Sequence, residues 1–211
     1  MNRDILYREM ELGDYSDLLK LVIDTWRYNE WVAENLVAPL AEKFMVETLL
    51  NSSQRIVATY DGNLIGVLAA DTAIEDPFTI LCKCKEIDAL LRLTENDTGD
   101  NTILHQYLKT KRLNLDMLES RYECYQGLIN LLIVKDGYKG FGIGSKLFGM
   151  ANNYFHDNNV SRFYLFTDSA SNVHFYEIKG MRRVREISYK WDENNVQSIE
   201  VYYMYEGFTL E

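Results

Sequence analysis

A chain of 211 residues is long enough for one well-cored domain with an insertion, but short for two full domains. Its net charge of −10 disfavours nucleic acid as a partner, since phosphate contacts require clustered Lys and Arg, and it mildly favours a cationic one. No apolar run has the length of a membrane helix and the first residues are polar, so we expect a cytoplasmic protein without a membrane partner.

The first third of the chain is expected to form strands and helices in turn. Residues 4–10 are typical of a short strand, and apolar residues recur at helical spacing over about 14–26 and 33–50. The strands "QRIVATY" and "LIGVLAAD" flank Asp61 and Gly62, a pair typical of a tight hairpin turn.

The segment from about 72 to 121 is expected to be an inserted helical hairpin within a single domain that covers residues 1–211. Two apolar series keep the three-and-four spacing of a helix on either side of the polar break "TENDTGDN". The series are Phe78, Leu81, Cys84, Ile87 and Leu91, then Leu104, Tyr107, Leu108, Leu115 and Leu118. Long connections with their own secondary structure usually serve as lids or interaction surfaces.

The last third predicts a regular succession of strands and helices. Strands are expected over 128–134 and 162–168, with a helix over 142–157 between them. A short helix follows, capped by Ser171 or Asn172 and ended by Gly180, and then two long strands joined by the turn "DENN". Together these strands and helices predict a mixed sheet with helices on both faces, a fold of the α/β or α+β class.

The three cysteines, Cys82, Cys84 and Cys124, indicate reduced thiols and no metal site. Their number is odd, and no second ligand pair matches the Cys-x-Cys spacing. The histidines are scattered along the chain, so they complete no ligand set.

The stretch "VKDGYKGFGIGSKLFG", residues 134–149, is typical of a phosphate-binding loop between a strand and a helix. A Walker A loop would need Lys directly after Gly142, where Ile143 stands. A dinucleotide fingerprint from Gly140 would need Gly at Ser145. A nucleophile elbow, Gly-x-Ser-x-Gly, is also absent.

What remains is a metal-free cradle of backbone N–H groups beside a helix N-terminus. Glycines at 140, 142 and 144 free these groups from side-chain bulk, which suits a pyrophosphate. The alternative is a tight turn whose glycines serve packing alone.

Two segments together resemble the GNAT superfamily of N-acetyltransferases, which transfer acetyl from acetyl-CoA to amines. Lys139 to Gly144 is similar to the motif Gln/Arg-x-x-Gly-x-Gly/Ala, with Lys in the first place. "NVHFYEIKGM", residues 172–181, resembles Asn-x-x-x-x-Tyr-Glu-x-x-Gly-Phe, with Met181 for Phe. The resemblance covers about three-quarters of the chain and leaves out the insertion.

The resemblance implies a twisted, mostly antiparallel sheet with a central pair of splayed parallel strands, 128–134 and 162–167. The pantetheine arm of acetyl-CoA would lie between them, bonded by backbone groups of the first strand, and the pyrophosphate would lie on the glycine loop. The residues implied to contact CoA are Leu132, Ile133, Val134, Lys139, Gly140, Phe141, Gly142, Ile143, Gly144, Ser145 and Asn172.

Tyr176 is the general acid that the resemblance implies, protonating the departing CoA thiolate. Asn172 either caps the short helix or bonds the CoA arm. Some members of the superfamily carry a Glu before the glycine loop, where this chain has Leu128 and Asn130. Glu123, the nearest acid, is expected to be a solvated surface charge, so no base is assigned.

These features predict an acetyl-CoA-dependent N-acetyltransferase that acts on a primary amine of a small molecule or peptide, by direct attack through a tetrahedral intermediate. The alternative is a non-catalytic acyl-CoA-binding protein that keeps the fold for sensing or assembly. The insertion is expected to roof the acceptor site or, alternatively, to form a homodimer interface.

Overall fold

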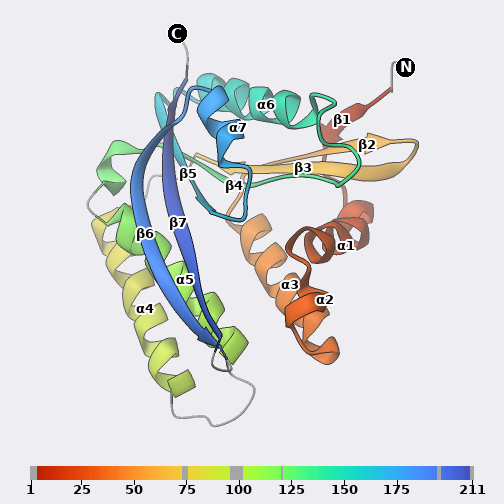
Figure 1. Ribbon diagram of the computed structural model, residues 1–211. Helices are drawn as coiled ribbons and strands as arrows, with labels where there is room; N and C mark the ends of the chain where they lie inside the picture. Colours follow the sequence, from red (N-terminus) through yellow and green to blue (C-terminus); the bar gives the residue numbers. More distant parts are fainter. Residues whose placement is uncertain (1–3, 73–75, 96–101, 120, 194–195, 210–211) are drawn as a thin grey trace. The chain divides into compact units, whose positions relative to one another are not determined.

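The computed structural model describes residues 4–72, 76–95, 102–119, 121–193 and 196–209, and the chain divides into two compact units (Figure 1). The first unit comprises residues 1–72 and 127–160, and the second comprises 73–126 and 161–210. The first contains β1 (Leu6–Glu9), α1 (Tyr15–Trp26), α2 (Tyr28–Trp31), α3 (Glu34–Leu50), β2 (Gln54–Tyr60), β3 (Asn63–Asp71), β4 (Gly127–Val134) and α6 (Ile143–Asp157). The second contains α4 (Pro77–Glu95), α5 (Thr102–Leu118), β5 (Arg162–Asp168), α7 (Val173–Ile178), β6 (Arg182–Glu193) and β7 (Val196–Phe208).

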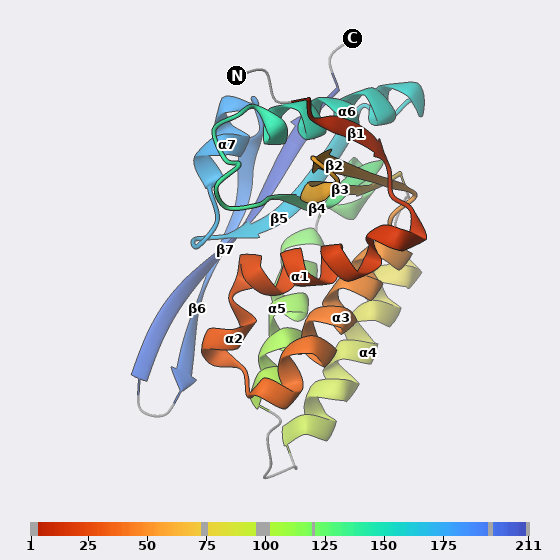
Figure 2. The same cartoon turned by 90° about the vertical axis from the view of Figure 1, so that its right-hand side faces the viewer.

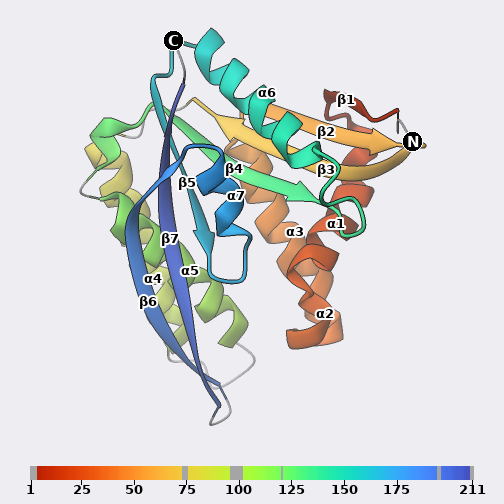
Figure 3. The same ribbon diagram turned by 45° about the horizontal axis from the view of Figure 1, so that its top comes forward.

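The strands of the first unit pair antiparallel in the order β1-β2-β3-β4. The turn between β2 and β3 uses left-handed backbone at Asp61 (φ 51°) and Gly62 (φ 75°), which confirms the hairpin that this pair predicts. Helix α6 covers one face of the sheet, and α1 and α3 lie on the other (Figures 2 and 3). The sheet is therefore buried on both sides, with Ile65 and Val67 of β3 fully enclosed.

In the second unit β5, β7 and β6 pair antiparallel in that order, with a helix on each face. Because side chains alternate along a strand, residues of β7 with even and odd numbers face opposite ways. Tyr202 meets Thr110 of α5, with 3.4 Å between their hydroxyl oxygens. Tyr205 instead donates to Glu177 of α7 at 3.0 Å.

The segment expected to be an inserted helical hairpin holds α4 and α5, which pack against each other. Arg112 of α5 donates to Asp88 of α4 at 3.0 Å. Phe78 and Leu81 belong to the apolar series that predicts this helix, but they are 73% and 51% exposed. The buried residues of α4 are Ile80, Cys84 and Ile87. The polar break and the turn "DENN" lie partly outside the described residues.

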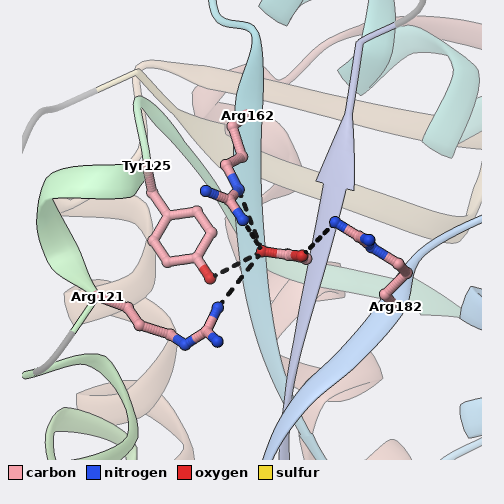
Figure 4. A network of polar contacts seen from close by, with 5 residues as sticks. Arg121, Tyr125, Arg162 and Arg182 are labelled. Atoms are coloured by element: carbon pink, nitrogen blue, oxygen red, sulfur yellow. Dashed lines mark hydrogen bonds and ion pairs between the residues drawn. The ribbon is translucent and has the colours of Figure 1, made fainter.

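A buried carboxylate, Glu206, ties together four segments of the second unit (Figure 4). Arg162 of β5 donates to it at 2.7 and 3.1 Å, and Arg182 of β6 donates at 2.8 Å. The Tyr125 hydroxyl donates at 3.2 Å, and Arg121 lies 3.8 Å away. Burying a charge is favourable only when partners replace its water, and here three guanidinium groups do so. We read this network as a structural clamp.

Candidate functional site

The glycine-rich segment forms the loop between β4 and α6 in the first unit. The loop is attached to the sheet at its start, where the N–H of Lys135 donates to the C=O of Ile65 at 2.8 Å. At its end Gly142 is the N-cap of α6, and its C=O accepts the N–H of Lys146 at 3.0 Å. The sequence prediction of a strand, a glycine loop and a helix in this order is therefore confirmed.

Gly140 and Gly142 are required by backbone conformation. Their φ angles are 85° and 79°, a left-handed region that L side chains rarely adopt. Beyond the adjacent residues, no atom lies within 4 Å of a Cβ added at either position, whereas one added at Gly127 would come within 2.8 Å of the Phe155 ring. Packing against the protein therefore does not explain these two glycines, and they leave the backbone uncovered.

The first turn of α6 offers the N–H groups of Ile143, Gly144 and Ser145. These groups precede the first intrahelical hydrogen bond, and Gly142 has no side chain with which to cap them. They lie at the positive end of the helix dipole, which favours anions. The side chain of Ile143 is only 1% exposed, so this residue can offer a ligand only its N–H.

Lys139 is the cationic side chain of the loop. Its Nζ lies 2.6 Å from Oδ1 of Asp136, and it lowers the pKa of that carboxyl by hydrogen bonding and charge. Both side chains are mostly exposed, and such surface pairs contribute little to stability. The ammonium can therefore turn to another anion at small cost. Phe141, two residues further along the loop, is 55% exposed.

Gly66 of β3 also positions the loop, although the sequence analysis did not single it out. A Cβ at this position would lie 3.1 Å from the C=O oxygen of Ile133 and 3.3 Å from side-chain atoms of Ile143 and Leu147. The missing side chain lets the first turn of α6 pack directly on the sheet. An isolated Gly inside a strand pattern signals such a close approach.

The last residues of β4 are those expected to bond the pantetheine arm. Leu132, Ile133 and Val134 pair antiparallel with Leu68, Val67 and Gly66 of β3. Ile133 is buried, and its two neighbours are half-buried. These contacts occupy one edge of β4, and the strand leads directly into the glycine loop.

Tyr176 lies on α7 in the second unit and is half-buried. Its ring centroid is 5.9 Å from that of Tyr205 on β7. Burial, and secondarily the charge of Asp168, raises the pKa of Tyr176 to about 12. The phenol is therefore protonated near neutral pH, as a general acid must be. It is, however, a weaker acid than the ordinary phenol of pKa about 10.

The short helix α7 is held on the sheet through Glu177. The carboxylate accepts the Tyr205 hydroxyl at 3.0 Å and Arg183 at 3.2 Å, and Arg183 also donates to the Tyr205 oxygen at 3.1 Å. These bonds lower the pKa of Glu177, the Tyr205 hydroxyl being the largest cause. The residue next to Tyr176 therefore anchors the helix that carries it.

Asn172 does not cap α7 with its side chain, which is exposed. Asn172 occupies the N-cap position of α7, as predicted, but no side-chain hydrogen bond caps the helix. The side chain of Asp168 accepts the N–H groups of Ala170 and Ser171 in the turn before the helix, both at 3.0 Å. Asp168 can do so because the chain turns back on itself directly after β5. The other alternative, that Asn172 bonds the CoA arm, stays a prediction.

No general base is assigned from the structure either. Asn130 of β4 donates its amide to the C=O of Asn51 at 2.6 Å and to Ser52 Oγ at 3.0 Å, so its role is structural. Glu123 lies in the short turn Tyr122–Cys124, and its side chain is outside the described part of the chain.

Among the described residues, no three His, Cys, Asp or Glu side chains lie close enough together to hold a metal ion. No helix in the same part of the chain is long and apolar enough to cross a membrane.

Comparison by sequence alone finds nothing similar: no family model and no curated protein matches this chain. Comparison of structures does find similar proteins. Polyamine N-acetyltransferase of Drosophila melanogaster, which catalyses the formation of N-acetylagmatine, superimposes with a TM-score of 0.66 at 13% identity, over 97% of this chain and 100% of that chain. An acetyltransferase of the GNAT family from Streptococcus pneumoniae gives 0.52 at 12% identity, over 98% and 100%.

A third similar structure contains the expected ligand. The PaiA N-acetyltransferase of Thermoplasma acidophilum, in complex with coenzyme A, gives a TM-score of 0.51 at 13% identity, over 97% of this chain and 99% of that chain. The chain therefore has the fold of GNAT acetyltransferases, and the fold class predicted from the sequence is confirmed. At such low identity the likeness establishes the fold alone.

Proposed function

We propose that this protein is an acetyl-CoA-dependent N-acetyltransferase that acts on a primary amine. The observation that carries the proposal is the glycine loop at the N-terminus of α6. Gly140 and Gly142 leave its backbone uncovered, and the first N–H groups of the helix are not capped by a side chain. This arrangement fits the pyrophosphate of coenzyme A, and it needs no metal.

The backbone from Lys139 to Ser145 would hold the pyrophosphate, and that of Leu132 to Val134 would bond the pantetheine amides. Asn172 would bond the same arm. Acetyl-CoA supplies an acyl group already activated as a thioester. The solved structures with this fold support the proposal, because they include N-acetyltransferases and a complex with coenzyme A.

In the proposed reaction the neutral amine attacks the thioester carbonyl, and the C–N bond forms as the C=O π electrons move onto oxygen to give a tetrahedral intermediate. The C–S bond breaks when this intermediate collapses. A strand N–H would stabilise the oxyanion of the tetrahedral intermediate. Tyr176 would give its proton to the departing thiolate, which becomes the free thiol of CoA. The amine loses its surplus proton to water, because no side chain is assigned as the base.

The test mixes the protein with acetyl-CoA and a panel of amines, and measures free thiol. We expect thiol release that depends on both protein and amine, and a product about 42 Da heavier than the amine. Acid catalysis raises the rate roughly 10²-fold or more, which this assay can detect. Binding of acetyl-CoA without amine-dependent release would support the non-catalytic alternative. No binding of acetyl-CoA would overturn both.

A further inference from the structure

Four side chains gather on one face of the β6–β7 hairpin, and we call them the Glu200 cluster: Tyr189, Trp191, Glu200 and Tyr202. Tyr189 lies directly opposite Glu200 in the antiparallel register. Trp191 and Tyr202 each stand two residues further along their strands, so all four share a face. Tyr202 is buried and the other three are half-buried.

The carboxylate of Glu200 is held in a fixed orientation by neutral donors. Trp191 Nε1 donates to its Oε2 at 3.0 Å, and the Tyr202 hydroxyl donates to the same oxygen. Trp191 Nε1 also lies 3.2 Å from the Tyr202 oxygen, which closes the network. The second oxygen, Oε1, accepts no hydrogen bond from a described residue, and no described Lys, Arg or His forms an ion pair with Glu200. A half-buried carboxylate that forms no ion pair can bind a cation without displacing a cationic side chain of the protein.

Aromatic rings beside this carboxylate add to its attraction for a cation. The rings of Tyr189 and Trp191 lie 4.6 Å apart, with an angle of 62° between their planes. The face of an aromatic ring attracts an ammonium group, most strongly in Trp and Tyr. The ammonium of Lys109 on α5 already lies 5.2 Å from the centre of the Tyr189 ring. This ring therefore attracts one ammonium group within the chain itself.

The cluster lies at the end of β5 from which the chain enters α7. Asp168, the last residue of β5, pairs with Tyr202, and Ser169 donates its N–H to the C=O of Val201 at 2.8 Å. Glu200 is thus adjacent in sequence to the residue that holds the start of the α7 connection. This connection leads across the edge of the sheet to Tyr176 on its opposite face, which we propose as the catalytic acid.

Docking of α5 is a simpler explanation for these polar residues, but it does not account for Glu200. The hydrogen bond from the cluster to α5 joins the hydroxyls of Thr110 and Tyr202, 3.4 Å apart. Glu200 takes part in it only indirectly, by accepting the hydroxyl proton of Tyr202. The docking of a helix does not require an oriented carboxylate on the sheet that it covers.

We propose that the Glu200 cluster binds a positively charged group of the acceptor, which makes the substrate a diamine or another amine with a second cation. This inference rests on the proposed acetyltransferase function. Glu200 would accept the charged group on Oε1, and the faces of Trp191 and Tyr189 would enclose its methylene neighbours. Helix α5 would form the other side of the site through Thr110 and Lys109. The insertion would then shape the choice of amine.

The experiment compares 1,4-diaminobutane with n-butylamine, which has the same chain but one charge fewer. The wild type should bind the diamine more tightly by calorimetry and use it with the higher kcat/KM. Glu200→Gln keeps an acceptor for Trp191 and Tyr202 but removes the charge. It should lower diamine affinity and kcat/KM about tenfold or more, since hydrogen bonds between charged groups are the strong ones, and leave n-butylamine unchanged.

Two further variants keep the test decisive. Glu186→Gln removes a carboxylate from the opposite face of the same hairpin, where Glu186 pairs with Arg183. It should change neither the affinity nor the kcat/KM for either amine. Trp191→Phe removes the donor that orients Glu200 and should weaken diamine binding even if Glu200→Gln fails to fold.

The outcomes separate this inference from the proposed function. Diamine binding that Glu200→Gln abolishes, without turnover of any amine, would support the cation site and contradict acetyl transfer. Equal use of both amines, unchanged in Glu200→Gln, would overturn the cation site while supporting acetyl transfer.

Discussion

Two glutamates on the same face of β7, Glu206 and Glu200, have opposite surroundings. Glu206 is 2% exposed, and three arginines and a tyrosine surround it (Figure 4). Glu200 is half-buried, and its partners are the neutral donors of Trp191 and Tyr202. Three guanidinium groups face the first carboxylate, whereas the second forms no ion pair with a described Lys, Arg or His.

The contrast distinguishes a carboxylate that holds the fold from one prepared for a ligand. A protein tolerates a buried charge only when internal partners replace its water. For Glu206 these partners are cations from segments far apart in the sequence, which the carboxylate holds together. Where the chain orients a carboxylate but provides no cation, a ligand can provide it. We therefore expect changes at the Glu206 end of the second unit to affect stability, and changes at the Glu200 end to affect binding or turnover.

The largest expected effect is on stability, at Glu206. Glu206→Gln should lower the free energy of unfolding by about 3 kcal/mol, because it leaves three guanidinium groups together without their counter-charge. Urea unfolding measures this change. Glu186→Gln, at an exposed carboxylate of β6, should change stability by less than about 0.5 kcal/mol. A loss below about 1 kcal/mol at Glu206 would contradict its role as a clamp.

The next effect is on turnover, at Tyr176 on the opposite face of the same sheet. Tyr176→Phe should lower kcat about 10²-fold, since it removes the proton for the leaving thiolate, with acetyl-CoA affinity little changed. Tyr203→Phe is the matched control, because Tyr203 lies on the same face of β7 beneath Arg183. An unaltered kcat in Tyr176→Phe, with chemistry shown to limit the rate, would reject this residue as the acid.

A smaller effect is expected for the anchor of α7. Tyr205→Phe removes the hydroxyl that Glu177 and Arg183 share but keeps the ring against Tyr176. It should lower the stability of the protein, because it removes a hydrogen bond to a charged group. Thermal or urea unfolding measures the change. If stability were unaffected, α7 would be held by its apolar contacts and not by Glu177.

The smallest effect is expected at Lys109 near the Glu200 cluster. Lys109→Met removes a like charge from the proposed cation site while keeping an unbranched side chain over Tyr189. At separations of about 8 Å in water this repulsion is about 0.5 kcal/mol, so KM for the diamine should fall about twofold. A higher KM would show that the ammonium of Lys109 supports the site instead of competing with its ligand.

The sequence predicts the glycine loop well, because its signals are local. A strand, glycines with left-handed backbone and a helix follow each other within about twenty residues, and Asp61 and Gly62 specify their hairpin in the same way. The start of α4 is less predictable, since the apolar residues Phe78 and Leu81 fit the helical spacing but face outward.

The two glutamate sites could not be predicted, because they depend on strand register. A shift in the pairing of β6 with β7 between Arg183 and Arg185 decides which β6 side chains share a face with Glu200 and Glu206. Arg162 and Arg182 reach Glu206 from β5 and β6, and nothing in the local sequence marks them as partners. Alternating strand patterns specify two faces but not which residues meet across them.

The measurement that tests the central claim most directly is calorimetric titration of acetyl-CoA into two glycine variants of the loop and its helix. Gly142→Val places a side chain where φ is 79° and where the pyrophosphate would approach. Gly149→Val, further along α6, is the control, because a Cβ there also meets no protein atom within 4 Å and φ is not left-handed. We predict at least tenfold weaker binding, about 1.4 kcal/mol, for folded Gly142→Val and no change for Gly149→Val. Equal affinity in both variants and the wild type would contradict the assignment of this loop as the acetyl-CoA site.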